Sequence, residues 1–97
     1  MKILIVDDEE FARLRLRTLL AQIDDPPHQV VGEAEHAAAA LQRLAREPAD
    51  LVLLDIGLPG ETGLQLAARF AAAPGSPAVV FVTAHADHAL AAFELDA

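Results

Sequence analysis

The sequence predicts a single α/β domain built on a parallel sheet, and two observations carry that prediction. Apolar runs of strand length alternate with longer segments of helical period, which is the pattern of repeated βα units. The length of 97 residues suits one domain, expected to span residues 1–97. Apolar residues make up 54% of the chain and aromatic residues only 4%, so the predicted core is aliphatic.

Four apolar runs predict the strands of the sheet. The second run is weak and suits an edge strand, whereas the third is almost wholly apolar, as expected of a central strand covered on both faces. The predicted strands are Lys2–Val6, Gln29–Ala34, Leu51–Leu54 and Ala78–Val82.

Four segments between and after these runs predict helices, at residues 9–23, 37–46, 64–73 and 86–95. In the first helix Leu14 is expected to be half exposed. Its inward face is expected to carry Ala12, Leu16, Leu19, Leu20 and Ile23. In the second helix Leu41 and Leu44 are expected to point inward. The arginines at 13, 15, 17, 43 and 46 are expected on solvated helix faces.

Composition excludes several classes of function. The chain has no cysteine, which rules out disulfides and thiolate metal sites and fits a cytoplasmic protein. A formal charge of −8 argues against direct binding of nucleic acid. No apolar stretch approaches the roughly 20 residues that a membrane span needs. We therefore expect a cytoplasmic domain that contacts neither membrane nor nucleic acid.

Polar residues follow three of the predicted strands directly. Asp7 and Asp8 follow the first strand, Asp55 follows the third, and Thr83 follows the fourth. Ligands of open parallel sheets bind beyond the carboxyl ends of the strands, so these side chains should share one crevice. Mg²⁺ prefers such oxygen ligands. Asp8 and Asp55 are the expected direct carboxylate ligands, with Asp7 binding through water.

The same crevice offers a nucleophile for phosphoryl transfer. A carboxylate can form an acyl phosphate, and Asp55 is best placed because it follows the most buried strand. Thr83 would donate its hydroxyl to a phosphoryl oxygen, and the small Ala84 would leave room for the group. Each of these residues, taken alone, could have a purely structural role as a solvated strand end, a helix cap or a β-forming residue.

As a set, these motifs resemble the receiver domain of bacterial two-component response regulators. The resemblance is carried by the segments Ile3–Glu9, Leu53–Pro59 with Gly63, and Val82–Ala84. It implies a flavodoxin-like (CheY-like) parallel sheet with strand order 2-1-3-4-5. Phe11-Ala12-Arg13, Thr83-Ala84-His85 and the segment Ala89–Glu94 look like the subfamily with a LytTR-type DNA-binding domain.

The resemblance also implies roles for individual residues. Asp55 would accept a phosphoryl group from a sensor histidine kinase, with Mg²⁺ held by Asp8, Asp55 and the Gly57 carbonyl, and Asp7 in support. Thr83 would be the switch hydroxyl, while Gly57 and His85 would tune hydrolysis of the acyl phosphate. The domain would then be a regulated switch rather than a turnover enzyme. It would contact DNA only through an output domain that lies outside this chain.

The sequence departs from the family pattern in one respect. The family has a fifth strand bearing a switch aromatic and a conserved lysine, followed by a fifth helix, and this chain ends at Ala97 before them. The only lysine is Lys2. We therefore expect an incomplete domain with weak phosphorylation. Its fourth strand would be an uncovered edge, which favours a homodimer or an exchange of elements between copies.

Two other functions compete with the phosphoacceptor switch. One is a phosphorylation-independent dimerisation or interaction module, which an uncovered edge strand favours. The other is a hydrolase of the aspartyl-phosphate type. The sequences of such enzymes look like Asp-x-Asp at the nucleophile, whereas this chain has Asp55-Ile56-Gly57. A small phosphodonor with Mg²⁺ separates the three, because only the switch predicts a lasting adduct on Asp55.

Overall fold

The computed structural model describes residues 1–82, which form a four-stranded sheet with helices on both faces. All neighbouring strands pair in parallel, and their order is β2-β1-β3-β4. The strands are β1 (Lys2–Val6), β2 (Gln29–Ala34), β3 (Leu51–Leu54) and β4 (Ala78–Phe81). The predicted fold class, strand order and edge position of β2 are therefore confirmed.

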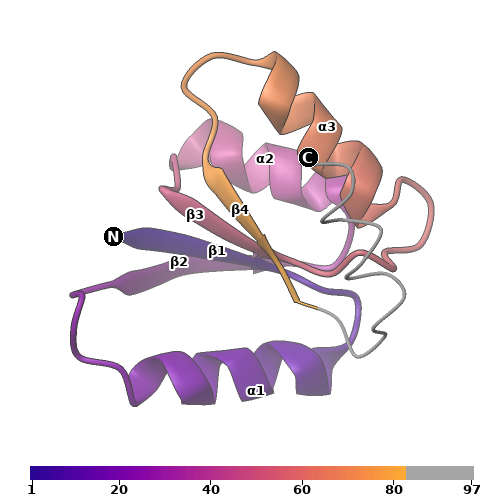
Figure 1. Cartoon of the computed structure of the whole chain (residues 1–97). Coiled ribbons are helices and arrows are strands. Elements are labelled where there is room, and N and C mark those ends of the chain that lie inside the picture. The colour runs from indigo at the N-terminus through magenta and orange to yellow at the C-terminus, as the bar shows by residue number, and fades with distance from the viewer. Residues whose placement is uncertain (83–97) are drawn as a thin grey trace.

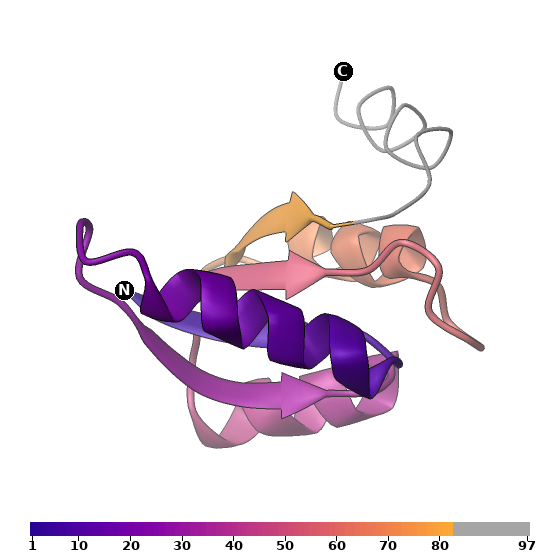
Figure 2. The ribbon, with the colours of Figure 1, turned by 90° about the horizontal axis from the view of Figure 1, so that it is seen from below.

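The helices divide between the two faces of the sheet. Helix α1 (Glu10–Ala21) lies on one face, and α2 (Ala37–Arg46) and α3 (Gly63–Ala72) lie together on the other (Figures 1 and 2). The predicted bounds of α2 are confirmed, and those of α3 are wrong by one residue at each end. The predicted helix over 86–95 lies outside the described residues. No helix within residues 1–82 is long and apolar enough to cross a membrane.

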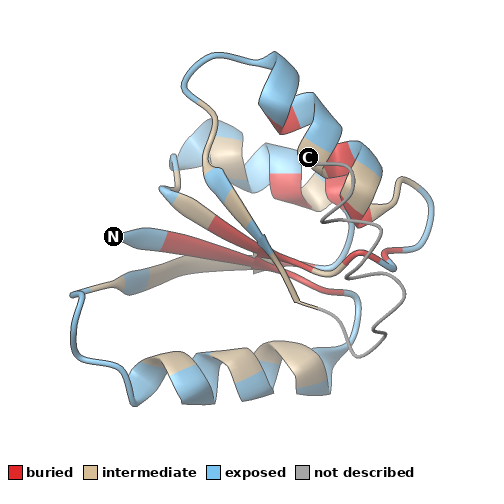
Figure 3. Cartoon of the chain, in the orientation of Figure 1, coloured by how far each residue is buried: buried red, intermediate tan, exposed pale blue. Residues whose placement is uncertain are grey.

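The alternation of side chains along the strands produces two apolar clusters, one on each face. The larger cluster lies under α2 and α3 and includes Leu4, Val6 and Leu54 from the sheet. The smaller lies under α1, where Ile3 and Ile5 meet side chains of that helix. Figure 3 shows the buried residues concentrated in the central strands and on the inner sides of α2 and α3. Strands β1 and β3 are thus fixed from both sides.

Helix α1 covers its face less fully than its sequence period predicts. Leu16 and Leu20 pack against the sheet, and Leu14 is 46% exposed, as predicted. Leu19 and Ile23, which were predicted to face inward, are each 47% exposed, so that prediction is wrong. The reason is that the helix ends at Ala21 and only a narrow stripe of it meets the strands.

Helix α2 is packed through small residues. Ala37 and Ala40 are buried and Leu44 packs against the larger cluster, as predicted for Leu44. Leu41 is 36% exposed, so its predicted inward position is wrong. The alanines bring the helix backbone close to the sheet and leave the leucine at the border of the contact.

Candidate metal centre

The three acidic residues predicted to meet all follow strands whose ends are held in register. The backbone N–H of Asp7 donates to the Ala34 carbonyl at the end of β2, at 3.0 Å. The N–H of Asp55 donates to the Val6 carbonyl at the end of β1, at 2.9 Å. Each residue beyond a strand is therefore tied to the neighbouring strand, which places the acids at one edge of the sheet.

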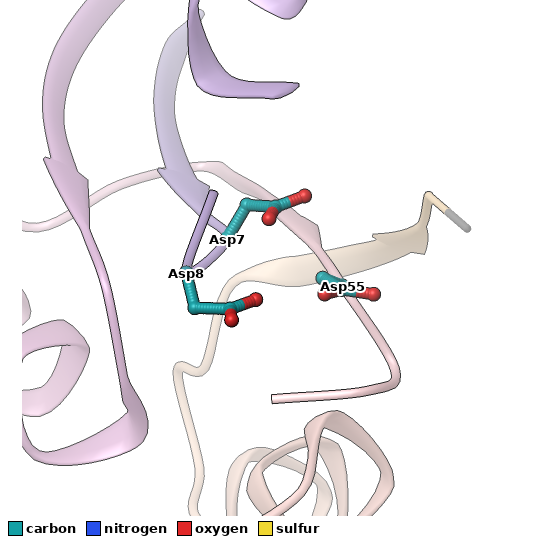
Figure 4. A group of neighbouring side chains, drawn as sticks. All are labelled: Asp7, Asp8 and Asp55. Atoms are coloured by element: carbon teal, nitrogen blue, oxygen red, sulfur yellow. The ribbon is translucent and has the colours of Figure 1, made fainter. Parts of the chain in front are cut away.

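Asp7, Asp8 and Asp55 form a cluster that Figure 4 shows with its side chains directed into a common space. One carboxylate oxygen from each lies within 4.8 Å of those of the other two. Asp7 is buried, Asp55 is partly buried and Asp8 is exposed. The predicted convergence of the three acids is confirmed, and the cluster is open to solvent on the Asp8 side.

The surroundings of Asp7 disfavour its charged form. Burial raises the pKa of the Asp7 carboxyl, and the nearby charges of Asp55, Asp8 and Glu9 raise it further. The hydrogen bond from the Glu9 N–H to Asp7 Oδ1, at 3.0 Å, acts in the opposite direction. The net shift is upward, so the protein itself leaves part of this negative charge uncompensated.

The donor set fits a small hard cation. Three carboxylates supply hard oxygen ligands, and the open side leaves room for the water that Mg²⁺ retains. A bound cation would relieve the repulsion that raises the Asp7 pKa. We therefore regard these side chains as suited to magnesium.

Gly57 lies beside the cluster on the loop after β3. Its N–H donates to Asp55 Oδ1 at 3.1 Å, so one oxygen of that carboxylate is oriented by the loop backbone. A Cβ at this position would lie 3.8 Å from Asp55 Oδ1, an ordinary contact. The loop thus positions Asp55 through its backbone, and no steric need for glycine arises there.

Arg13 is the residue of this region that the sequence analysis missed. It was expected on a solvated face, but its side chain is only 13% exposed and contacts two other elements. Its Nη1 donates to the Asp7 carbonyl at 2.8 Å, and its Nε donates to Glu33 Oε1 at 3.2 Å. Helical period cannot reveal such bonds, because Glu33 lies on a strand 20 residues away.

Two predicted site residues, Thr83 and Ala84, lie outside the described residues, as does His85. The preceding residue, Val82, donates its N–H to the Leu54 carbonyl at 2.9 Å. The chain therefore reaches the end of β3 immediately before Thr83. Lys2, the only lysine, begins β1, where its Nζ lies 3.4 Å from a Glu47 oxygen.

The chain matches known proteins along almost its whole length. Residues 3–97 match the family described as the response regulator receiver domain. The whole chain is 45% identical to the sensory transduction protein LytR of Staphylococcus haemolyticus, of which it covers 37%. It is also 45% identical to the positive alginate biosynthesis regulatory protein of Pseudomonas aeruginosa, of which it covers 39%. The chain thus spans less than two fifths of the length of these relatives.

Solved structures show the same fold. The response regulatory domain of protein mrkE from Klebsiella pneumoniae superposes with a TM-score of 0.84 at 34% identity, covering 100% of this chain and 78% of that one. The isolated REC domain of RcsB from Salmonella enterica serovar Typhimurium, in the presence of the phosphomimetic BeF3−, gives a TM-score of 0.84 at 26% identity. That match covers 99% of this chain and 72% of the other.

Proposed function

The chain belongs to the response regulator receiver domain family, and on that premise we propose that Asp55 accepts a phosphoryl group from a sensor histidine kinase. Residues 1–97 would act as one receiver domain. Members of this family are phosphoacceptor switches that sensor histidine kinases phosphorylate, and they bind Mg²⁺ at an acidic pocket. The observation that carries the proposal is the meeting of three carboxylates within 4.8 Å at the carboxyl edge of the sheet.

Asp55 is the best nucleophile of the cluster. It is partly buried at the end of the central strand β3, and the Gly57 N–H holds its Oδ1 at 3.1 Å. Within the described residues no protein hydrogen bond involves its other oxygen, which is therefore available to attack. That oxygen would form a bond to phosphorus as the bond to the donor imidazole breaks, and the imidazole would leave with the electron pair.

The other acids would hold the cation. Asp8, Asp55 and the Gly57 carbonyl would bind Mg²⁺ directly, and Asp7 would bind through water. When bound, the cation reduces the electrostatic repulsion between the negatively charged carboxylate and the phosphoryl group. The exposure of Asp8 supports its role, because its carboxylate can reach a solvated ion, while the buried Asp7 orients the loop.

Thr83 and Ala84 complete the proposed site. The bond between Val82 and the end of β3 supports their placement, because it brings the chain to the acidic edge one residue earlier. Thr83 would donate its hydroxyl to a phosphoryl oxygen, and Ala84 would leave space for the group. Slow hydrolysis of the acyl phosphate, tuned by Gly57 and His85, would return the switch to its resting state.

We further propose that the switch controls transcription through an output domain beyond this chain. The names of the relatives support this proposal, since one is a positive regulator of alginate biosynthesis and others are named transcriptional regulatory protein LytR. The formal charge of −8 favours DNA contact through that output domain, of LytTR type, rather than through this one. We propose a cytoplasmic location, which is consistent with membership of this family.

A second candidate function is homodimerisation, including exchange of elements between copies. Strand β4 is the last strand on its side of the described sheet, and its Val80 is 47% exposed. An unpaired strand edge with an exposed apolar side chain favours pairing with another chain. This candidate requires neither a phosphoryl group nor the acidic cluster.

Intact-mass spectrometry of the full chain separates the proposals. After incubation with a small phosphodonor and Mg²⁺, we expect one phosphoryl adduct, which is lost in Asp55→Asn and strongly reduced when Mg²⁺ is chelated. A pure dimerisation module would give no adduct and the same association with or without donor. Continuous release of phosphate without a lasting adduct would instead indicate a hydrolase.

A further inference from the structure

Arg13 joins three elements at the acidic edge of the sheet. It lies in the first turns of α1, donates to the Asp7 carbonyl after β1 at 2.8 Å, and pairs with Glu33 on β2 at 3.2 Å. A third nitrogen, Nη2, lies 3.8 Å from Glu35. A planar guanidinium presents several N–H groups in fixed directions, so Arg13 can make its two hydrogen bonds and the longer ion pair to Glu35 at the same time. The single ammonium group of a lysine could not reproduce this geometry.

The bond to the Asp7 carbonyl bears on the position of Asp8. That carbonyl belongs to the peptide unit between Asp7 and Asp8. Because a peptide unit is planar, holding its oxygen also fixes the orientation of the unit and the position of the Asp8 Cα. The N–H of Asp7 is already held by Ala34, and its Oδ1 accepts from Glu9. Arg13 adds a restraint on the Asp7 carbonyl, which adjoins the exposed Asp8.

Glu33 keeps the guanidinium in place. Its Oε1 accepts from Arg13, and its Oε2 accepts from Arg17 Nη1 at 2.6 Å. Its side chain is only 24% exposed, so these charge-assisted bonds are partly shielded from water. Strand β2 is thereby linked through Glu33 and Arg13 to the loop that carries Asp7 and Asp8.

We propose that Arg13 is a positioning residue for the acidic cluster, holding the peptide before Asp8 so that its carboxylate faces Asp55, with Glu33 anchoring the guanidinium. This inference rests on the proposed function and assigns to it a residue that touches neither cation nor phosphoryl group. It predicts that the loss of Arg13 weakens cation binding in a protein that remains folded.

The test is a Mg²⁺ titration of the full chain followed through the backbone amide signals of Asp8 and Gly57. In Arg13→Gln we expect the dissociation constant to rise by about 10-fold, the effect typical of losing a group that orients a metal ligand. Arg15→Gln is the matched control, because it removes the same charge from an exposed position on the same helix. The control should stay within about twofold of the wild type.

Two more variants separate positioning from stability. Glu33→Gln should raise the dissociation constant by a smaller factor, about threefold, because Arg13 keeps its bond to the Asp7 carbonyl. Arg17→Gln removes the other partner of Glu33 and should leave Mg²⁺ binding almost unchanged. Thermal unfolding of each variant without Mg²⁺ identifies any variant that fails to fold. If Arg13→Gln fails to fold, Glu33→Gln is compared with the control in its place.

A measurement without metal tests the positioning directly. The Glu9 amide donates to Asp7 Oδ1, so its hydrogen exchange should be faster in Arg13→Gln than in Arg15→Gln. Equal exchange in these two variants, or equal Mg²⁺ affinity, would overturn the inference. A wild-type protein that binds no Mg²⁺ would contradict the proposed function instead, and the Glu9 exchange rates would still decide the role of Arg13.

Discussion

The Asp7 carboxyl is buried beside two other acids, and its pKa is raised, first by burial and then by the neighbouring charges. The folded protein therefore keeps a proton on Asp7 to a higher pH than the unfolded chain, in which the pKa of this carboxyl has its ordinary value of 3.8. Where the folded state binds more protons, the free energy of unfolding falls as the pH rises. Asp7 thus lowers the stability of the metal-free protein progressively as the pH rises through and above 3.8.

Replacing Asp7 with asparagine should remove this loss. In Asp7→Asn without Mg²⁺, we expect the free energy of unfolding at neutral pH to exceed that of the wild type by on the order of 1 kcal/mol. The asparagine oxygen can still accept the Glu9 N–H, so the local turn is retained. Urea unfolding at several pH values checks this result. A gain that persists undiminished at a pH well below 3.8 would contradict the assignment to the charge.

The sequence predicted the acids of the site but not Arg13, which hydrogen-bonds to the loop that carries them. Asp7, Asp8 and Asp55 were predictable because each follows an apolar run, and strand ends of a parallel sheet share one edge. Arg13 was not, because its partners come from a loop carbonyl and a distant strand. Bonds of this kind depend on how α1 settles against β2, which no local pattern encodes.

At the scale of elements, the start of α3 lies directly against the loop that carries Asp55. Gly63 is buried, its N–H donates to the Ile56 carbonyl at 2.9 Å, and a Cβ on it would lie 2.8 Å from Ile56 Cα and closer still to the Asp55 carbonyl oxygen. Thr62 and Gln65 cap this helix end reciprocally. The helix therefore fixes the Asp55 loop by close backbone contact.

A side chain at position 63 should disturb both the fold and the site. For Gly63→Ala we expect a loss of about 1–3 kcal/mol in the free energy of unfolding, since backbone atoms must move to admit the methyl group. Chemical denaturation measures this loss. Gly32→Ala is the control, because a Cβ there meets only side-chain atoms at 3.5 Å. Equal effects of the two substitutions would show that the tight approach at Gly63 has no special role.

The strands and helices differ in how well their sequences define them. The bounds of three strands, β1, β2 and β3, were predicted correctly. Runs of this length that alternate with helical segments are too short for helices and fit only the strands of a βα pattern. The burial of α1 and α2 was less predictable. Leu19 and Leu41 lie on helices, and their exposure depends on how wide a stripe of each helix meets the sheet, which helical period alone does not define. Ile23 is exposed because α1 ends before it, at Ala21.

At the scale of the whole molecule, the alternating pattern predicted a parallel α/β sheet, whereas the strand order was predicted only through the family resemblance. Strand β4 forms one edge of the described sheet. Val80 pairs in register with Leu53, whose side chain is buried, yet Val80 itself is 47% exposed. This strand therefore presents apolar surface on the same face as α1.

We expect that surface to promote association between copies of this chain. Light scattering at increasing concentration should show a mass above that of the monomer, and Val80→Lys should shift the distribution toward monomer, because a charged edge disfavours strand pairing. The exposed Leu41, on the opposite side of the sheet, offers a control through Leu41→Lys. A clean monomer at high concentration would contradict the expectation.

The central claim is that the acids gathered at the sheet edge make Asp55 the phosphoacceptor. Borohydride reduction of the phosphodonor-treated protein, followed by peptide mass spectrometry, locates the acyl phosphate by converting the modified carboxyl to an alcohol. We predict reduction at Asp55 alone, and only in protein incubated with both donor and Mg²⁺. Reduction at Asp7 or Asp8, or none in a folded protein that binds Mg²⁺, would contradict the account.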